Sequence, residues 1–292
     1  MSIGDAEIKT QERVIRFFRD PEILGYQYIG NLSDYQNKNI KEDRLRQYLR
    51  LKGYADKLID AAIMQLQQEA GNLSRGVYDA NKTVYSRLKY GIPVSESPEK
   101  PPVTVELIDE ANPLNNDFAI AEEVTVVEQQ EKRPDLVIYL NGIAVAVIEL
   151  KRSSISVSEG IRQNLTNQKD SFIRGFFTTM QFCMAGNESE GLRYGTLLTG
   201  EKFYMEWKDD GFKEHEEERD PVDVRISKTC EGIENKLLKQ IYAMFDKERF
   251  IDLIMNFVVF DKGIKKVCRY NQYFGIKRTQ QRLNNLRTEL HN

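Results

Sequence analysis

The feature that most constrains the fold of this chain is an apolar stretch with charged ends, RPDLVIYLNGIAVAVIELKRSS at residues 133–154. Asn141 and Gly142 are a strong two-residue turn signal, because both residue types tolerate positive φ. The segments that they join, 135–140 and 143–150, are apolar on both faces, and such strands are central in a sheet that is covered on both sides. The stretch therefore predicts a buried hairpin within a layered domain.

Helical patterns precede this hairpin, further strand patterns flank it, and helical patterns follow. Helices are predicted over 8–20, 40–52, 55–70, 76–89, 156–173, 230–245, 248–261 and 276–290, and strands over 103–108, 117–127, 135–140, 143–150, 179–186 and 193–199. This order predicts an α/β fold, with a mixed sheet flanked by helices, an N-terminal helical portion and a C-terminal helical connector. We expect a boundary near residue 230, between a domain over 1–230 and a connector over 231–292.

Composition excludes several classes of protein. The chain contains no run of about 18 apolar residues, so no membrane span is predicted. Its N-terminus, MSIGDAEIKT, lacks the apolar core of a signal peptide, which predicts a cytoplasmic location. The formal net charge is −3, whereas free-standing DNA-binding proteins usually carry a basic excess. Any contact with nucleic acid must then be local, or depend on a partner that supplies positive charge.

Cysteine and histidine offer no site of their own in this sequence. Cys183, Cys230 and Cys268 are far apart and odd in number, which argues against a disulfide framework or a zinc site with the usual close spacings. His215 and His291 are the only histidines, and both stand in polar surroundings. The chemistry of the chain is therefore expected from carboxylates and lysine.

The charged ends of the hairpin provide such groups. Glu149 and Lys151 are two residues apart on a strand, so their side chains share a face, and Asp135 reaches the same end from the neighbouring strand. Two converging carboxylates suit a hard divalent cation such as Mg²⁺, and an adjacent lysine can orient a water molecule or offset phosphate charge. A structural hairpin with charged ends is the plainer interpretation, but it leaves this convergence unexplained.

The register of the hairpin tests this idea. A strict two-residue turn would place Asp135 opposite Ile148, on the face away from Glu149. For both carboxylates to meet one metal ion, the hairpin needs a bulge, a wider turn or a backbone bend after Pro134.

The same residues resemble a known signature. RPD, thirteen residues and ELK are similar to the PD-(D/E)xK motif of nucleases. The flanking segments NDFAIAEEVTV, KRPDLVIYLNGIAVAVIELKRS, GIRQNLTNQ and GLRYGTLLTG together resemble the N-terminal part of the restriction, or motor, subunit of type I restriction enzymes. The resemblance runs from about residue 8 to the C-terminus.

The resemblance implies a restriction-endonuclease-like fold and a Mg²⁺-dependent endonuclease that cuts double-stranded DNA. It also implies ATP, used by a helicase-like motor domain C-terminal to this region, and methyltransferase and specificity subunits as partners. By position, Asp135 and Glu149 match the metal-binding carboxylates, Lys151 matches the catalytic lysine, and the backbone carbonyl of Leu150 is an additional metal ligand. No phosphate-binding loop occurs, so we expect the motor to be truncated and this chain to lack ATPase activity.

Four further residues are considered because of the resemblance. The helix after the hairpin carries a Gln-x-x-x-Tyr motif in the family. Gln163 matches its glutamine, but Asn167 stands where the tyrosine would be, which leaves the role of Asn167 open against a plain polar helix face. Glu12 in the first helix is a candidate acidic residue near the metal, or a plain surface residue. Gln272 falls where such motors read adenine, a role that needs the complete motor.

Two alternatives stay open. One is a nuclease-fold module that binds DNA or partner subunits without cleaving, against which the intact Asp135, Glu149 and Lys151 argue. The other is a helical scaffold with a purely structural hairpin, which would have no affinity for a metal ion. Titration with Mn²⁺ separates the scaffold from the nuclease.

Overall fold

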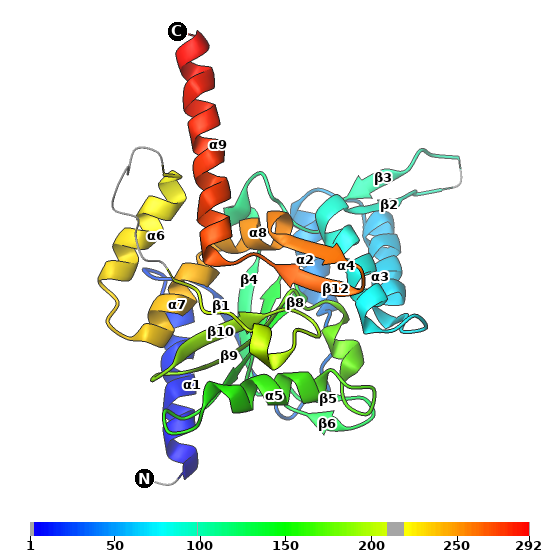
Figure 1. The fold of residues 1–292 in the computed structure, drawn as a ribbon. Coiled ribbons are helices and arrows are strands. Elements are labelled where there is room, and N and C mark those ends of the chain that lie inside the picture. The colour runs from blue at the N-terminus through cyan, green and yellow to red at the C-terminus, as the bar shows by residue number, and fades with distance from the viewer. Residues whose placement is uncertain (1–2, 98, 209–218, 292) are drawn as a thin grey trace.

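A six-stranded mixed sheet forms the centre of the molecule, in a computed structural model that describes residues 3–97, 99–208 and 219–291 (Figure 1). The strand order is β1–β4–β7–β8–β9–β10, with parallel pairing at β1–β4 and β8–β9 and antiparallel pairing elsewhere. The strands are β1 (Gln27–Asn31), β4 (Phe118–Glu122), β7 (Leu136–Leu140), β8 (Ile143–Leu150), β9 (Phe182–Asn187) and β10 (Gly191–Gly195). The predicted hairpin, β7–β8, is central and buried throughout, and the α/β prediction is confirmed.

Helices and loops cover both faces of this sheet. The larger hydrophobic cluster joins one face to helices α1 (Ile3–Arg19), α2 (Glu42–Leu51), α3 (Asp56–Gly71), α4 (Val77–Tyr90), α7 (Lys236–Phe245) and α8 (Lys247–Asn256). A second cluster joins the other face to residues from 173 to 180, and α5 (Val157–Asn167) packs on that side of β9 (Figure 1). Because both faces are covered, the central strands are apolar in every position up to the charged end of β8.

The turn of the central hairpin forms at the predicted residues. Asn141 and Gly142 have φ values of 52° and 81°. A Cβ atom on Gly142 would lie 2.7 Å from the Leu45 nitrogen and from the Lys41 carbonyl oxygen, so only glycine allows α2 to approach the turn this closely.

A β-bulge then changes the pairing along the hairpin. Tyr139 pairs with Ala144 near the turn, but Leu136 pairs with Ile148, and the register shifts between Ile138 and Tyr139. Val145 is the extra residue on β8. The predicted departure from a strict hairpin is therefore present as a bulge, and the shifted register places Asp135, one residue before β7, opposite Glu149.

Several predicted elements are shorter than the sequence patterns suggested. The helix predicted over 156–173 ends at Asn167, and a 3₁₀ turn, η2 (Arg174–Thr178), follows it. Residues 103–108 supply only β3 (Val103–Val105), which pairs with β2 (Ile92–Val94) in a ribbon that projects from the body (Figure 1). Local β propensity is present there, but the ribbon lies outside the main sheet.

The C-terminal region differs from the prediction at two places. The helix predicted over 230–245 begins only at Lys236, and residue 230 belongs instead to a preceding helix that ends at Glu231. Residues 248–261 were expected to be helical, but α8 ends at Asn256, and β11 (Val258–Asp261) pairs with β12 (Ile264–Val267). The cause lies in the local sequence VVFDKG, because β-branched residues favour a strand and Lys262 and Gly263 take the positive φ values of a tight hairpin turn.

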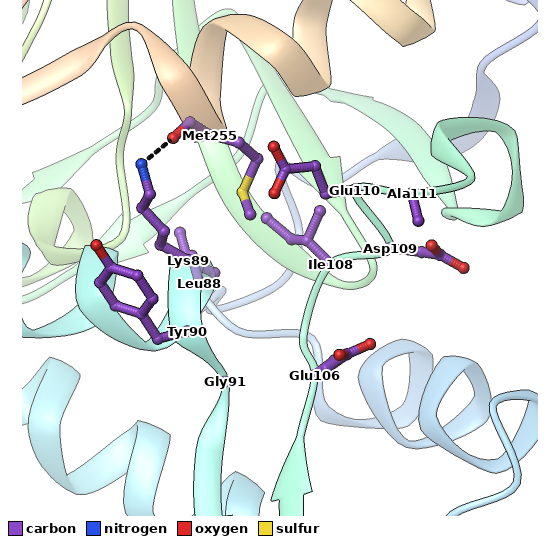
Figure 2. A pocket seen from close by; sticks show the side chains of 10 residues that line it. All are labelled: Leu88, Lys89, Tyr90, Gly91, Glu106, Ile108, Asp109, Glu110, Ala111 and Met255. Atoms are coloured by element: carbon purple, nitrogen blue, oxygen red, sulfur yellow. Dashed lines mark hydrogen bonds between the residues drawn. The ribbon is translucent and has the colours of Figure 1, made fainter. Parts of the chain in front are cut away.

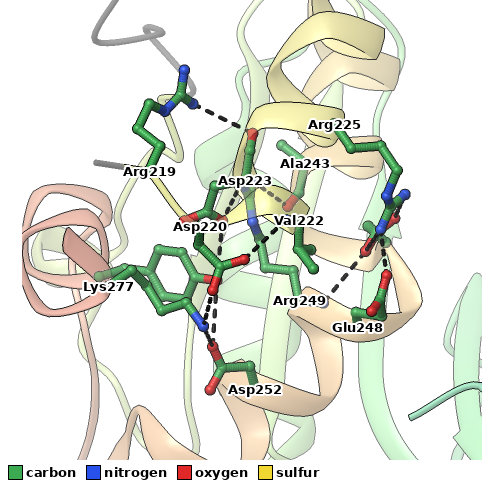
Figure 3. Close-up of polar contacts among 12 residues, drawn as sticks. Arg219, Asp220, Val222, Asp223, Arg225, Ala243, Glu248, Arg249, Asp252 and Lys277 are labelled. Atoms are coloured by element: carbon green, nitrogen blue, oxygen red, sulfur yellow. Dashed lines mark hydrogen bonds and ion pairs between the residues drawn. The ribbon is translucent and has the colours of Figure 1, made fainter. Parts of the chain in front are cut away.

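A network of ion pairs connects the C-terminal helices to one another (Figure 3). Arg249 of α8 donates to Asp223 of α6 (Pro221–Glu231) over 2.9 Å, and both side chains are buried. Lys277 of α9 (Tyr270–His291) contacts Asp220 at 3.0 Å and Asp252 at 2.9 Å. Beyond this anchor α9 extends away from the body (Figure 1). None of the helices in the described ranges combines the length and apolar character that a membrane crossing requires.

Candidate active site at the end of the central hairpin

Asp135 and Glu149 meet at the end of the hairpin opposite the turn. The Asp135 carboxylate accepts a hydrogen bond from the Leu150 backbone nitrogen at 2.7 Å, which ties it directly to the end of β8. Glu149 is completely buried. The side chains of Val137 and Val147, two residues along each strand, lie in the cluster on the α5 side of the sheet, so strand alternation places both carboxylates on that side.

Burial makes the ionised forms of these two acids costly. Burial raises the pKa of Asp135 to about 6, although the nearby Lys151 ammonium opposes the shift. Burial, and then the negative charge of Asp135, raise the pKa of Glu149 well above its ordinary value. Two carboxylates that disfavour each other's charge, Glu149 buried and Asp135 half-buried, favour the addition of a cation or a proton between them.

Lys151 supplies positive charge next to the two carboxylates and so favours their ionised forms. Its ammonium donates to the Leu150 carbonyl oxygen at 2.9 Å and to the Glu7 carboxylate at 3.1 Å. Burial lowers the pKa of Lys151, but the charges of Asp135, Glu149 and Glu7 outweigh burial, and the pKa is raised overall. Lys151 is therefore held charged beside both acids.

The first helix contributes a different acid from the one considered in the sequence. Glu7 contacts Lys151, whereas Glu12 is exposed on α1. Gln11 of the same helix donates to Glu122 at 2.9 Å and to Glu123 at 3.1 Å, and Glu123 adjoins Asp135 through a backbone hydrogen bond of 2.8 Å. Nothing local in the sequence distinguishes Glu7 from other helical glutamates, because the helix meets the hairpin only through tertiary packing.

Helix α5 brings Gln163 to the site. Its amide nitrogen donates to one oxygen of Glu149 at 2.6 Å. Gly160 permits this approach, because a Cβ atom there would lie 2.9 Å from the Ala185 Cβ and 3.4 Å from the Glu149 Cβ. Ser156 caps the start of this helix, where its hydroxyl accepts a hydrogen bond from the Ser158 nitrogen. Asn167 is also buried, in the last turn of α5.

A basic hollow of about 440 Å³ opens beside these residues. It is lined by Lys132, Arg133, Lys151, Glu159, Arg162, Gln163, Thr166 and Asn167. Arg133 is oriented by Glu123 at 2.7 Å, Arg162 is oriented by Glu201 at 2.9 Å, and the Lys132 ammonium lies 4.9 Å from the centre of the Phe172 ring. The hollow gives a chain of net charge −3 a local basic surface, which is one of the two possibilities that the net charge leaves for a contact with nucleic acid.

The donors at the hairpin end fit a magnesium ion. Glu149 Oε1 is buried and has no hydrogen-bond partner among the described residues, so one carboxylate oxygen is left for a ligand. Carboxylate and carbonyl oxygens are the donors that Mg²⁺ prefers. Among the described residues, no group of three or more His, Cys, Asp and Glu side chains is positioned to hold a metal ion. The candidate set is therefore the two carboxylates with the Leu150 carbonyl.

Two other hollows lie away from these residues. Gln272 lines one of about 710 Å³ between the β11–β12 hairpin and α9, where its side-chain oxygen accepts from the Arg269 nitrogen at 2.9 Å. Figure 2 shows another of about 370 Å³ at the end of α4, where Lys89 contacts the Met255 carbonyl. None of the residues predicted for catalysis or metal binding lines either hollow, so the hairpin end remains the candidate active site.

Comparison with known proteins gives a consistent family. Residues 7–203 match the model of the family described as type I restriction enzyme R protein N terminus. Two similar proteins come from Methanocaldococcus jannaschii. The putative type I restriction enzyme MjaVIIIP endonuclease subunit is 27% identical over 90% of this chain and 24% of its own length. The putative MjaIXP endonuclease subunit is 27% identical over 69% of this chain and 20% of its own length.

A bacterial relative shows the same relation. The type I restriction enzyme HindI endonuclease subunit of Haemophilus influenzae is 25% identical over 67% of this chain and 18% of its own length. The chain thus spans about a fifth to a quarter of the length of the curated relatives that it matches.

Proposed function

Since this chain belongs to the family of type I restriction enzyme R protein N termini, we propose that its central hairpin is a Mg²⁺-dependent endonuclease site that hydrolyses phosphodiester bonds of double-stranded DNA. The observation that carries the proposal is the meeting of Asp135, Glu149 and Lys151 at one buried hairpin end, where one carboxylate oxygen of Glu149 has no hydrogen-bond partner among the described residues. Acids with strongly raised pKa values beside a specific cation are typical of active sites, and here the cation, Lys151, also lines the basic hollow.

Each residue has a distinct role in this proposal. Asp135, Glu149 and the Leu150 carbonyl would hold Mg²⁺, which when bound supplies a Lewis acid for the phosphate and an activated water. A carbonyl oxygen has two lone pairs, so Leu150 can accept from Lys151 and still serve as a ligand. Lys151 orients the attacking water or offsets the charge that develops on the phosphate. Gln163 fixes the orientation of Glu149. From α1, Glu7 is better situated than Glu12 to act in the site, because it holds Lys151.

The basic hollow is the proposed contact for the DNA backbone. Lys132, Arg133 and Arg162 border it, and phosphate oxygens pair well with such side chains. The contact is small, and the chain as a whole is acidic. We therefore expect weak, salt-sensitive DNA binding by this chain alone, and stronger binding within a complex.

We further propose that the chain acts as part of a larger assembly. The relatives that it matches are named as endonuclease subunits and are several times longer. In this proposal the partners are methyltransferase and specificity subunits, residues 231–292 connect the nuclease region over 1–230 to an ATP-driven motor, and Gln272 contacts adenine once that motor is complete. A nuclease-fold module that only binds DNA or partners remains the alternative, and it predicts no cleavage under any condition.

Metal binding is the first test of the proposal. We expect Mn²⁺, used as a probe for Mg²⁺, to stabilise the chain by about 2.7 kcal/mol at a concentration a hundred times its dissociation constant. Asp135→Asn should abolish this gain, and Glu12→Gln, at an exposed position of α1, should retain it. An equal gain in the Asp135→Asn variant would place the metal elsewhere, and no gain in the wild-type chain would favour a structural hairpin.

Cleavage is the second test. Plasmid nicking should be measured on this chain and on the full-length subunit with its partners, ATP and Mg²⁺. We expect cleavage by the complete assembly and its loss in Asp135→Asn. If the wild-type assembly binds metal and DNA but never cuts, the binding module is the better description.

A further inference from the structure

A lysine of the C-terminal hairpin is buried in the middle of the molecule. Lys265 of β12 is 2% exposed, although lysine is almost never fully buried without a paired charge. Its ammonium donates to Asn81 Oδ1 at 2.9 Å, to the Met180 carbonyl at 2.9 Å and to Gln181 Oε1 at 2.7 Å. Three acceptors match the three N–H groups of an ammonium, and all three acceptors are neutral.

No carboxylate contributes to this environment among the described ion pairs. The rings of Tyr85 and Phe260 lie 5.9 and 5.2 Å from the Lys265 nitrogen and add a weaker attraction for the cation. Burial lowers the pKa of Lys265 to about 7. An aliphatic residue would fill this space without the cost of burying an ammonium. The groups that the ammonium binds are therefore the clue to its role.

Two of the three acceptors of Lys265, Met180 and Gln181, belong to one turn, residues 177–181. Asn81 of α4 also donates from its side-chain nitrogen to three carbonyls of that turn, at Phe177, Thr178 and Met180. Gln181, the last residue of the turn, donates from its backbone nitrogen to the Val145 carbonyl at 2.7 Å. Val145 is the bulged residue of β8. An unbroken set of hydrogen bonds therefore joins Lys265 to the bulge.

The bulge determines which residues face each other at the candidate active site. With it, Asp135 stands opposite Glu149, and without it Asp135 would stand opposite Ile148 on the other face. The parallel pairing of β8 with β9 begins at Ala146 and Phe182, directly after Val145 and Gln181. Whatever stabilises the turn thus also stabilises the register of the two carboxylates.

We propose that Lys265 is a positioning residue, which through Gln181 and Val145 holds the register that brings Asp135 and Glu149 together. The inference rests on the proposed function for its catalytic meaning. Lys265 lies beyond residue 203, where the match to the family model ends. In this chain the geometry of the site consequently depends on docking of the C-terminal hairpin.

The test compares two adjacent lysines. Lys265→Met keeps the length of the side chain and removes its three donors. Lys266→Met is the matched control, because Lys266 is exposed on the same strand and pairs with Asp261. Mn²⁺ affinity is measured by isothermal titration below the melting temperature, and amide hydrogen exchange of residues 143–150 is measured without metal.

We expect Lys265→Met to weaken Mn²⁺ binding by about 10-fold, the lower end of the range for residues that orient metal ligands, and to accelerate exchange in 143–150. Lys266→Met should change neither. A folded Lys265→Met chain with Mn²⁺ affinity within twofold of wild type and unchanged exchange overturns the proposal.

A second variant keeps the idea testable if Lys265→Met does not fold. Gln181→Leu removes the side-chain oxygen that accepts from Lys265, so Lys265 keeps two acceptors and loses its hydrogen bond to residue 181. Its Mn²⁺ affinity should fall and its exchange in 143–150 should rise, and wild-type values for both overturn the proposal. If the wild-type chain binds no Mn²⁺, the proposed function fails, while the exchange measurement still decides whether Lys265 controls the hairpin.

Discussion

Two buried carboxylates in this molecule, Asp223 and Glu149, have opposite surroundings. Asp223 accepts from the Arg249 guanidinium at 2.9 Å and from the Tyr273 hydroxyl at 3.2 Å. Arg249 in turn lies 5.3 to 5.6 Å from the ring centres of three aromatic residues, Trp207, Tyr273 and Phe274. Glu149 accepts from the neutral amide of Gln163 on one oxygen, and its other oxygen has no partner among the described residues. Asp223 thus accepts from a cation within the fold, whereas Glu149 accepts only from a neutral donor.

This is the difference expected between a structural charge and the functional charge that we propose for Glu149. The buried Asp223 carboxylate links α6 to α8 through Arg249 and to α9 through Tyr273. The buried Glu149 and the half-buried Asp135 share one lysine, and their raised pKa values show that both disfavour a second negative charge unless a cation or a proton is added. Departures from local balance are expected at functional sites, where a fold gives up stability for activity.

The largest effect on stability should come from removing one partner of the buried Arg249–Asp223 ion pair. Asp223→Ala removes a buried carboxylate that accepts from both the Arg249 guanidinium and the Tyr273 hydroxyl, so we expect the free energy of unfolding to fall by about 3–5 kcal/mol. Urea denaturation measures this loss. Asp261→Ala breaks the exposed pair with Lys266 and should cost at most about 1 kcal/mol. A loss as small in Asp223→Ala would mean that the buried pair is not structural.

Removing the lysine of the incomplete site should affect activity rather than stability. We expect Lys151→Ala to lower DNA cleavage by the full assembly at least about 10²-fold, the scale of a general acid/base or electrostatic contribution. Both metal-binding carboxylates stay in place, and DNA-stimulated ATP hydrolysis should persist because the proposed motor lies elsewhere. Wild-type cleavage by a folded variant would contradict the assignment. Joint loss of cleavage and ATP hydrolysis would indicate an assembly defect.

Lys265 is an intermediate case, a buried cation with neutral acceptors. The titratable groups next to the Lys265 ammonium are Tyr85 and Cys183. Burial raises the pKa of each to about 12, so both are neutral near pH 7–9. Since burial lowers the Lys265 pKa to about 7, the unfolded chain binds a proton between pH 7 and 10 that the folded chain increasingly releases, and the neutral amine then donates to only two of its three acceptors.

The free energy of unfolding should therefore rise with pH in this window, by up to about 1.4 kcal/mol per pH unit. Urea denaturation of the wild type and of Lys265→Met at pH 7, 8 and 9 measures this contribution. We expect the variant to lose it, and equal slopes for the two chains would show that Lys265 stays charged throughout.

The smallest effect sharpens the comparison in the opposite direction. Glu149→Gln removes a buried charge and keeps the shape of the side chain, so we expect the metal-free protein to gain about 1 kcal/mol of stability above pH 7 while metal binding is lost. Glu12→Gln, at an exposed position, should change stability by less than about 0.5 kcal/mol. Destabilisation by Glu149→Gln would mean that the carboxylate is satisfied in the metal-free fold.

The central hairpin and its charged end follow from the sequence because they depend on local chemistry. The turn needs two residues that accept positive φ, and Asn141 and Gly142 provide them. The apolar strands predict their own burial, and Glu149 and Lys151 share a face through strand alternation. Gln163 lies in the helix that the sequence pattern predicts over 156–173. The chemical roles proposed for these residues come from the family resemblance.

Other parts of the site were decided only by tertiary structure. The sequence required a departure from strict pairing but allowed a bulge, a wider turn or a bend, and packing against the turn at Gln181 accompanies the bulge at Val145. Glu7 reaches Lys151 across 144 residues, and Lys265 reaches Asn81 across 184. Periodicity and turn propensity describe near neighbours along the chain, so they cannot report which distant side chains the folded sheet brings together.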